Sequence, residues 1–263
     1  MAYMEFFNPK VEVENICDWI KNYFSETENM NAKAVIGLSG GKDSTIAASL
    51  LVRALGSDRV IGVAMPQGKG SEEDTKLAKE IADILDIEFM IVDIEEAVYS
   101  ILKSMPVKCA TKGAILNIPP RVRMTVLYAI AQSCGGRVCN TCNRSEDYVG
   151  YSTKYGDTAG DFAILKTFTV RELLAIGEAL EIPLHLVIRP PADGLTGKTD
   201  EEVLGITYDE IDTYLLDNIC PEKNYKLNII RNKHYMNRHK DNINIPTYHR
   251  HVRPHERSLE HSI

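Results

Sequence analysis

Short apolar runs alternate with amphipathic segments along the first hundred residues. The runs at 34–36, 60–65 and 88–94 are typical of buried strands. The segments between them, 45–51 and 72–86, have the apolar spacing of helices. Strand, helix, strand, helix, strand with short links predicts an α/β fold with a doubly wound, Rossmann-like parallel sheet flanked by helices. Ligands of such sheets bind at the carboxyl ends of the strands.

The rest of the chain continues this pattern with longer gaps. Further helices are expected at 11–25, 121–133, 169–180, 208–216 and 221–240, and a fourth strand at 137–140. The helix at 11–25 is amphipathic and could cover the sheet or form a dimer seam; its apolar face carries Ile16, Trp19, Ile20, Tyr23 and Phe24. The helix at 72–86 is expected to turn Leu77, Ile81, Ile84 and Leu85 inward.

Four segments are predicted to be irregular. Residues 66–70 follow a strand and form a second candidate active-site loop. Residues 106–120 contain three prolines and are expected to form a loop. Residues 141–161 are polar and long, and irregular segments of this length are usually functional. Residues 189–197 are a candidate lid.

Length and composition agree with one enzyme-sized domain. The chain has 263 residues, and residues 1–248 are expected to form a single domain. The polar tail 249–263 holds four of the seven histidines, and 257–261 resembles the remnant of an expression tag. We therefore give the tail no function.

Charge and cysteine content exclude several classes of protein. A net charge of −7 disfavours a protein held mainly by nucleic-acid phosphates, so no nucleic-acid partner is expected. No apolar run reaches the roughly 18 residues of a membrane span, and the N-terminus lacks a signal-peptide pattern. Six cysteines without a secretion signal indicate reduced thiols and a cytoplasmic location.

The strongest chemical signal is a glycine-rich turn between the first strand and the following helix. Exposed amide groups of such a turn and the helix dipole together bind phosphate. Two glycines permit close backbone approach, and two serines supply hydroxyl donors. We call this segment the cradle; it is expected to bind ATP through Gly37, Leu38, Ser39, Gly40, Gly41, Lys42, Asp43 and Ser44.

The cradle is not a Walker A loop. Counting back from Gly41-Lys42 places Ile36 where that motif has its first glycine, and Asp43 stands where it has Ser or Thr. An aspartate beside phosphates requires a cation between them. The sequence therefore predicts a metal ion at Asp43.

The stretch Ser-Gly-Gly-Lys-Asp-Ser at 39–44 resembles the pyrophosphate loop of the ATP pyrophosphatase superfamily. Downstream segments narrow the resemblance to the NAD synthetase family: 117–124, 141–146, 152–161, 191–212 and 239–240 match it in order. The resemblance covers residues 10–246. It implies a homodimer, Mg²⁺, and synthesis of NAD from deamido-NAD, ATP and ammonia.

The resemblance also assigns roles to residues beyond the cradle. Asp43 and Glu146 would hold Mg²⁺, and Thr141 and Lys166 would contact ATP. Deamido-NAD would be held by Arg121, Lys154, Asp161, His239 and Lys240. The chain departs from the family pattern, and ATP or substrate contacts can shift accordingly, at Asn140, Val170, Pro191 and Asp241.

The implied reaction follows from the chemistry of a carboxylate, which is a poor electrophile. Attack of the nicotinate carboxylate on the α-phosphate of ATP gives an acyl-adenylate and pyrophosphate, and ammonia then displaces AMP. The protein positions the reactants and neutralises charge. Glutamine-dependent relatives carry a fused glutaminase domain for which this chain has no room, so free ammonia, or ammonia from a separate subunit, is the expected donor.

Two alternatives share the cradle. A tRNA-thiolating enzyme would use Cys139-x-x-Cys142 for sulfur transfer or for an iron–sulfur cluster, although one pair supplies too few cluster ligands. A nucleotide-binding regulator would bind ATP or AMP without turnover. The presence of both Asp43 and Glu146 argues against the regulator.

Overall fold

The computed structural model describes residues 3–26, 30–188 and 199–240. The whole candidate lid, 189–197, which includes Pro191, lies outside these ranges, as do Asp241 and the tail 249–263. Three short 3₁₀ helices occupy Tyr3–Glu5, Ser57–Arg59 and Val107–Cys109. None of the described helices is both long and apolar enough to cross a membrane.

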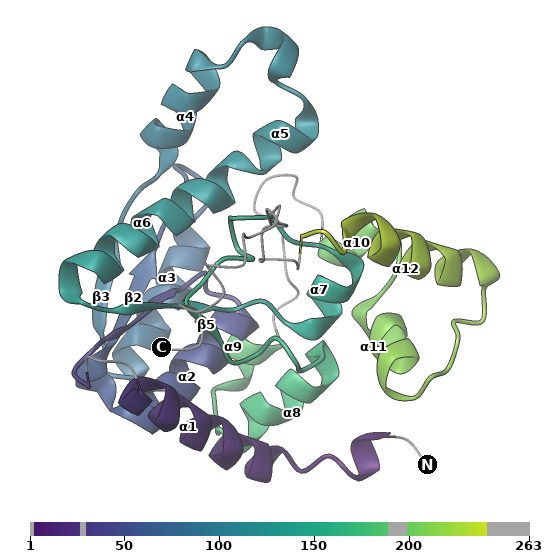
Figure 1. The fold of residues 1–263 in the computed structure, drawn as a ribbon, viewed down its shortest axis with the longest axis horizontal. Coiled ribbons are helices and arrows are strands. Elements are labelled where there is room, and N and C mark those ends of the chain that lie inside the picture. Colours follow the sequence, from purple (N-terminus) through teal and green to yellow (C-terminus); the bar gives the residue numbers. More distant parts are fainter. Residues whose placement is uncertain (1–2, 27–29, 189–198, 241–263) are drawn as a thin grey trace, which may run out of the picture.

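Five strands form one parallel sheet, as the alternating pattern predicts (Figure 1). Their order is β3–β2–β1–β4–β5. Their bounds are Ala34–Gly37 for β1, Val60–Ala64 for β2, Glu88–Ile91 for β3, Arg137–Asn140 for β4 and Phe162–Ala163 for β5. The order reverses between β1 and β4, and at such a switch point a crevice opens at the carboxyl ends of the two strands.

Helices cover both faces of the sheet, because alternate strand residues point to opposite sides. Ala34 and Ile36 face the core beneath α1, α2, α3, α8 and α9, whereas Val35 faces α4 and α6. These helices span Pro9–Glu26 (α1), Lys42–Leu55 (α2), Glu72–Ile84 (α3), Val170–Ala179 (α8), Leu184–Val187 (α9), Glu95–Ser104 (α4) and Ile118–Cys134 (α6).

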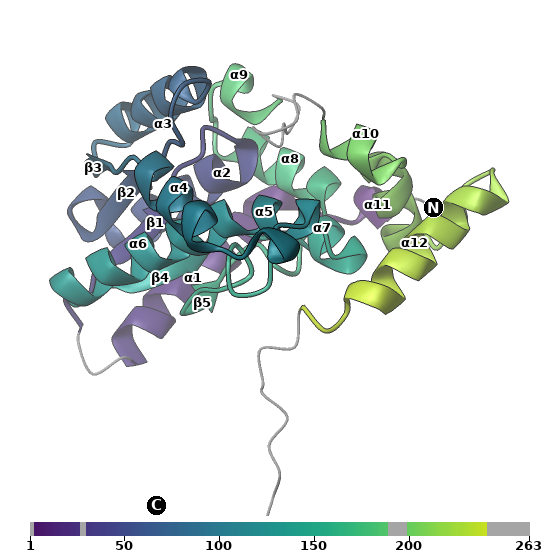
Figure 2. The ribbon, with the colours of Figure 1, turned by 90° about the horizontal axis from the view of Figure 1, so that it is seen from above.

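Four further helices form what we call the helical lobe. Figures 1 and 2 show α10, α11 and α12 at the end of the molecule away from β3 and α3. The bounds are Arg144–Val149 for α7, Asp200–Leu204 for α10, Tyr208–Leu216 for α11 and Asn224–Asn237 for α12. Their apolar side chains pack into a separate cluster of Val149, Leu204, Ile206, Tyr208, Ile211 and Ile230.

The prediction of a loop at 106–120 is wrong. Residues Lys112–Leu116 form α5, capped by Thr111, whose hydroxyl accepts from the amide of Ala114. Helix α6 begins at Ile118, and Pro119 and Pro120 lie in its first turn. Proline is tolerated there because the first amides of a helix have no intrahelical partner, so these prolines begin a helix and do not break one.

The segment 141–161 is not wholly irregular. Asn143 caps α7 by accepting from the amide of Glu146, and Gly150 ends that helix in the left-handed region with φ 64°. The two residues of β5 are too few to show a period in the sequence. Helices α4, α9 and α10 were also not expected from the pattern.

Two residues on the predicted apolar faces of helices are exposed, and for Ile84 this contradicts the inward position expected. Trp19 is 47% exposed and stacks on Tyr23 with ring centroids 5.5 Å apart. Ile84, in the last turn of α3, is 50% exposed, while Ala78 and Ala82 contact the core in its place. Small residues therefore carry part of the face that the sequence pattern assigned to larger ones.

Candidate active site

The cradle joins the carboxyl end of β1 to the start of α2, next to the switch point. Gly40 has φ +73°, and a Cβ there would lie 2.6 Å from the carbonyl oxygen of Asp74, so only glycine fits. The two serines brace the turn: the Ser39 amide donates to Ser44 Oγ (3.3 Å), and the Gly41 amide donates to Ser39 Oγ (3.2 Å). The turn is thus held in shape by its own side chains.

Lys42 and Asp43 form an ion pair inside the cradle. Lys42 is buried, and its Nζ lies 2.8 Å from Asp43 Oδ2. Asn143 also donates to this oxygen, from 3.4 Å. The other carboxylate oxygen, Asp43 Oδ1, is buried and has no hydrogen-bond partner among the atoms that the structure describes. Buried polar atoms are normally paired, so this oxygen indicates a missing ligand.

Glu146, on α7, faces the same ion pair. Desolvation and the nearby Asp43 carboxylate raise the pKa of Glu146 to about 8, although Lys42 opposes the shift. Burial lowers the pKa of Lys42, but Asp43 and Glu146 outweigh it and the net shift is upward. The structure thus brings together the two carboxylates that the sequence assigned to a metal, from segments about a hundred residues apart.

The arrangement fits Mg²⁺ better than a metal held only by protein. No group of three or more His, Cys, Asp or Glu side chains suited to a metal occurs in the described part of the chain. Magnesium commonly takes one or two carboxylates and completes its octahedron with phosphate oxygens and water. The unpaired Asp43 Oδ1 beside Glu146 supplies such a position.

The two other residues assigned to ATP flank this centre. Thr141 directly follows β4, the strand next to β1 at the switch point. Lys166 Nζ lies 3.5 Å from Asp147 Oδ2. Asp147 is buried, so neither member of the Glu146–Asp147 pair is a freely solvated surface charge.

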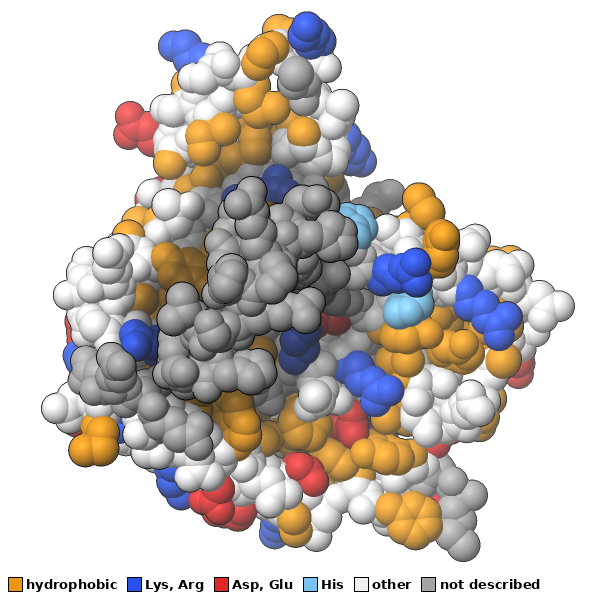
Figure 3. All heavy atoms as spheres, viewed as in Figure 1, with side chains coloured by type: hydrophobic (Ala, Val, Ile, Leu, Met, Phe, Trp, Pro, Cys, Tyr) orange, Lys and Arg blue, Asp and Glu red, His pale blue; other side chains and the backbone are white. Residues whose placement is uncertain are grey.

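Three of the five residues assigned to deamido-NAD form a chain of contacts, and a fourth, Lys240, follows the last of them in the sequence. Arg121 Nε donates to the carbonyl of Lys154 (3.2 Å), and Lys154 Nζ donates to the carbonyl of His239 (2.9 Å). Lys240 Nζ donates to the carbonyl of Gly150 (2.7 Å). Basic and histidine side chains gather over α7 and α12 on the face shown in Figure 3.

A groove of about 670 Å³ runs beside this chain of contacts. It lies between the outer face of α6 and residues 155–160, and it is lined by Arg121, Met124, Thr125, Tyr128, Ala129, Gln132, Tyr155, Ala159 and Gly160. Asp161, the fifth residue assigned to the acceptor, lies apart from the four. Its Oδ2 accepts from the Val138 amide (2.7 Å), and its carboxylate also bonds the side chain of Tyr128. Asp161 therefore joins the groove to β4.

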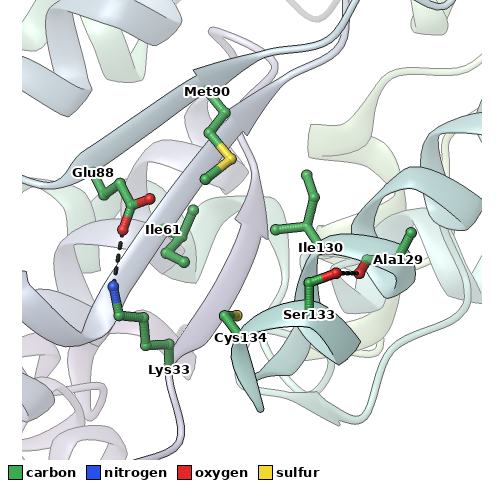
Figure 4. Close-up of a pocket in the computed structure, with 8 residues that line it drawn as sticks. All are labelled: Lys33, Ile61, Glu88, Met90, Ala129, Ile130, Ser133 and Cys134. Atoms are coloured by element: carbon green, nitrogen blue, oxygen red, sulfur yellow. Dashed lines mark hydrogen bonds and ion pairs between the residues drawn. The ribbon is translucent and has the colours of Figure 1, made fainter.

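A second pocket, of about 340 Å³, is not part of this site (Figure 4). Lys33 precedes β1, Glu88 begins β3, and Cys134 ends α6, so the pocket lies at the amino ends of the strands. The ion pair between Lys33 and Glu88 crosses its mouth at 2.9 Å. The cradle is at the opposite edge of the sheet.

The cysteine pair does not have the features of a sulfur-transfer site. Cys139 and Cys142 are both buried, and desolvation raises the pKa of each thiol well above its ordinary value. Their Sγ atoms donate to the carbonyls of Asn140 and Asp157. A thiolate is the reactive and metal-binding form, so this environment opposes the thiolation alternative.

Sequence analysis did not identify three residues at the site. Asn143 touches Asp43, and an Asn before a helical run is a recognisable cap signal. Arg123, largely buried, donates from Nε to the carbonyl of Met65 at the end of β2 (3.0 Å). Tyr208, 4% exposed, places its ring under Lys42 Nζ at 6.0 Å from the centroid. The sequence carries no local signal for Tyr208, because only the fold brings it to the cradle.

Comparison with known proteins gives consistent results. Residues 12–253 match the family model described as NAD synthase. An NH₃-dependent NAD⁺ synthetase of Methanococcus aeolicus is 37% identical, covering 77% of this chain and 82% of the relative.

Two solved structures illustrate the similarity of the fold. The NMN synthetase of Francisella tularensis is 32% identical with a TM-score of 0.83, covering 92% of this chain and 99% of the other. The NH₃-dependent NAD synthetase of Campylobacter jejuni is 24% identical with a TM-score of 0.74, covering 93% of this chain and all of the other, and it supports the fold alone.

Proposed function

Since this chain belongs to the NAD synthase family of ATP-dependent ligases, we propose that it converts deamido-NAD to NAD with ATP, Mg²⁺ and ammonia. The unpaired Asp43 Oδ1, beside Glu146 and Lys42 in the cradle, is the observation that carries this proposal. An unsatisfied carboxylate oxygen can bind a metal ion, and a buried lysine can bind phosphate oxygens. A site that contains both therefore suits a metal-bound triphosphate.

The cradle residues act on the phosphates. The Ser39 and Gly41 amides are taken by the serine hydroxyls, so the other amides of the cradle and of the first turn of α2 would bind the β- and γ-phosphates. Lys42 would balance the charge that grows on the leaving pyrophosphate. Asp43 and Glu146 would hold Mg²⁺, which would supply further neutralisation of the phosphates. Thr141 and Lys166 would contact ATP from the β4 side of the switch point.

The groove along α6 is the proposed place of the acceptor. Arg121, Lys154 and Lys240 would supply positive charge for its phosphates, His239 would offer a hydrogen bond, and Asp161 would act from its position beside Val138 and Tyr128. The role of these residues is to align the nicotinate carboxylate with the α-phosphate, which is a positioning effect.

We further propose that the enzyme acts as a homodimer. Large apolar side chains are exposed in β3, in α4 and in the segment that follows α4: Ile91 is 57% exposed, Tyr99 62% and Val107 93%. Figure 3 shows hydrophobic side chains over the arm that α4 and α5 form. Sedimentation of the wild type and of Tyr99→Asp tests this, with a dimer expected for the first and a shift toward monomer for the second.

A cytoplasmic location is the last part of the proposal. Cys17, Cys134, Cys139, Cys142 and Cys220 are free thiols, which suits a reducing compartment. Cell fractionation followed by antibody detection tests the location, and enrichment with membranes or in a secreted fraction would contradict it.

The central experiment measures NAD formation from deamido-NAD and ATP with ammonium or with glutamine. We expect Mg²⁺-dependent turnover with ammonium and little with glutamine. AMP and pyrophosphate should form in equal amounts. ATP cleavage to ADP and phosphate would contradict the proposed adenylation.

A second candidate substrate is nicotinate mononucleotide. The Francisella NMN synthetase superposes on this chain more closely than the Campylobacter NAD synthetase does. Amidation of the mononucleotide uses the same adenylation, and the acceptor merely lacks the AMP half of deamido-NAD.

Measuring kcat/KM for both acceptors under identical conditions separates the two candidates. A ratio of tenfold or more in favour of deamido-NAD supports the first proposal. The reverse ratio assigns the chain to NMN synthesis, with the cradle chemistry unchanged.

A further inference from the structure

Tyr208 carries an unsatisfied hydroxyl inside the site. Its side chain is 4% exposed, and the hydroxyl has no hydrogen-bond partner among the described atoms. Leaving a buried hydroxyl unpaired destabilises the folded state, because the group loses its hydrogen bonds to water and gains none in return. The fold nevertheless holds this unpaired hydroxyl in a fixed position. We take this to indicate that the hydroxyl gains a hydrogen-bond partner only when a ligand is bound.

Both the backbone and the ring of Tyr208 are held in place by their neighbours. Its amide donates to Glu201 Oε1 (2.7 Å), and Thr207 and Glu210 form a capping box at the start of α11. The ring packs in the apolar cluster of the helical lobe. The hydroxyl is therefore held in place before any ligand arrives.

The surroundings of the hydroxyl are those of the metal and phosphate centre. The charges of Glu146, Asp200 and Asp43 all act on it, and Lys42 lies over its ring. Phenol is protonated at neutral pH, so the group offers a donor. The site thus contains one buried acceptor without a donor, Asp43 Oδ1, and one buried donor without an acceptor, Tyr208 Oη.

These two orphan atoms call for ligands of opposite charge. A cation satisfies the carboxylate oxygen, and an anionic oxygen satisfies the hydroxyl. Resting on the function proposed above, we propose that the Tyr208 hydroxyl donates a hydrogen bond to a β- or γ-phosphate oxygen of ATP. In adenylation the nicotinate oxygen bonds to the α-phosphorus, the bond to the bridging oxygen breaks, and its electron pair leaves with pyrophosphate. Tyr208 keeps its proton and stabilises the charge on that leaving group.

The test uses Tyr208→Phe, which removes only the hydroxyl. Binding of inorganic pyrophosphate with Mg²⁺ should weaken about tenfold in calorimetry, and ATP-dependent pyrophosphate release should slow by at least as much. The melting temperature should stay the same or rise, because the variant removes an unsatisfied group and keeps the packing. The matched control is Tyr214→Phe in the same lobe, whose hydroxyl bonds Tyr148 and Arg231; it should bind and turn over like the wild type.

The outcomes separate this inference from the proposed function. If wild-type protein binds magnesium pyrophosphate and Tyr208→Phe binds it equally well, the role of Tyr208 is refuted. A marked loss of stability in Tyr208→Phe would also refute it, because the hydroxyl would then support the fold. If the wild type neither binds magnesium pyrophosphate nor releases it from ATP, the proposed function itself fails.

Discussion

The nucleotide half and the acceptor half of the site are built in different ways. The nucleotide half is a turn between β1 and α2 that is braced by its own serines, with Lys42 buried. The acceptor half is a surface groove that Arg121 lines. The lysines assigned to it reach across long stretches of chain to backbone carbonyls, as Lys154 does to His239 and Lys240 to Gly150. The first half is formed by local geometry, and the second depends on how the helical lobe packs on the sheet.

This difference separates chemistry from selectivity. A rigid, buried cradle suits a reaction in which charge must be balanced at fixed points. A groove lined by surface side chains can change its substrate through a few contacts. Variants in the nucleotide half should therefore slow adenylation with either acceptor, whereas variants in the acceptor half should lower kcat/KM for the acceptor alone.

The largest effect is expected for Asp43→Ala. Loss of the carboxylate leaves Lys42 buried without its partner and removes a proposed magnesium ligand. Adenylation should fall by roughly a thousandfold or more with either acceptor, as measured by pyrophosphate release. Asp83→Ala, at a residue paired only on the surface, is the control. Normal turnover of Asp43→Ala would refute the metal assignment.

Lys154→Ala should damage only the acceptor half. We expect kcat/KM for the acceptor to fall about tenfold to a hundredfold, with the KM for ATP unchanged. Loss of the contact to the His239 carbonyl should leave the cradle intact. An equal loss toward ATP would show that the two halves are not separable in this way. Lys21→Ala, in an exposed pair with Asp18, serves as the control.

Gly160→Ala tests the junction of the two halves. A Cβ at Gly160 would lie 2.7 Å from the Asn140 Cβ and 2.9 Å from its amide nitrogen, at the end of β4. Overpacking of this kind costs about 1–3 kcal/mol. Urea unfolding should show that loss, and both halves should weaken together. Gly113→Ala meets nothing within 4 Å and should change stability little.

The smallest effect concerns the pH dependence of the lobe. Asp212 accepts hydrogen bonds from Ser145 and from the Arg171 amide, yet burial raises its pKa to about 6. The folded state therefore holds this proton more tightly than the unfolded state, and the stability that it contributes is lost as pH rises from about 4 through 6. We expect roughly 1–3 kcal/mol over that range.

Comparing urea midpoints of the wild type and Asp212→Asn between pH 4 and 7 measures this contribution. As pH rises from 4 to 7, the urea midpoint of the wild type should fall relative to the midpoint of Asp212→Asn. A difference that is independent of pH would contradict the assignment to Asp212.

The local fold around the nucleotide half follows from the sequence more directly than the fold around the acceptor half, for a physical reason. Strand, turn and helix are adjacent in the chain, so the position of the cradle follows from short-range pattern. The meeting of Asp43 with Glu146 depends on β4 pairing beside β1, which the family resemblance anticipated and periodicity alone did not. The prolines of α6 were misinterpreted because the same residue both begins and breaks helices. Tyr208 reaches the cradle only through packing of the lobe.

The Lys42–Asp43 pair also bears on the sequence in which ligands enter. Each of these charges neutralises the other while the cavity is empty of substrate. Triphosphate alone would draw the lysine away and leave Asp43 facing the phosphates, and a free divalent ion would have to compete with Lys42 for the Asp43 carboxylate. The preformed magnesium–nucleotide complex would provide a new partner for both residues at once. This internal pairing would therefore favour entry of the two together over entry of either one by itself.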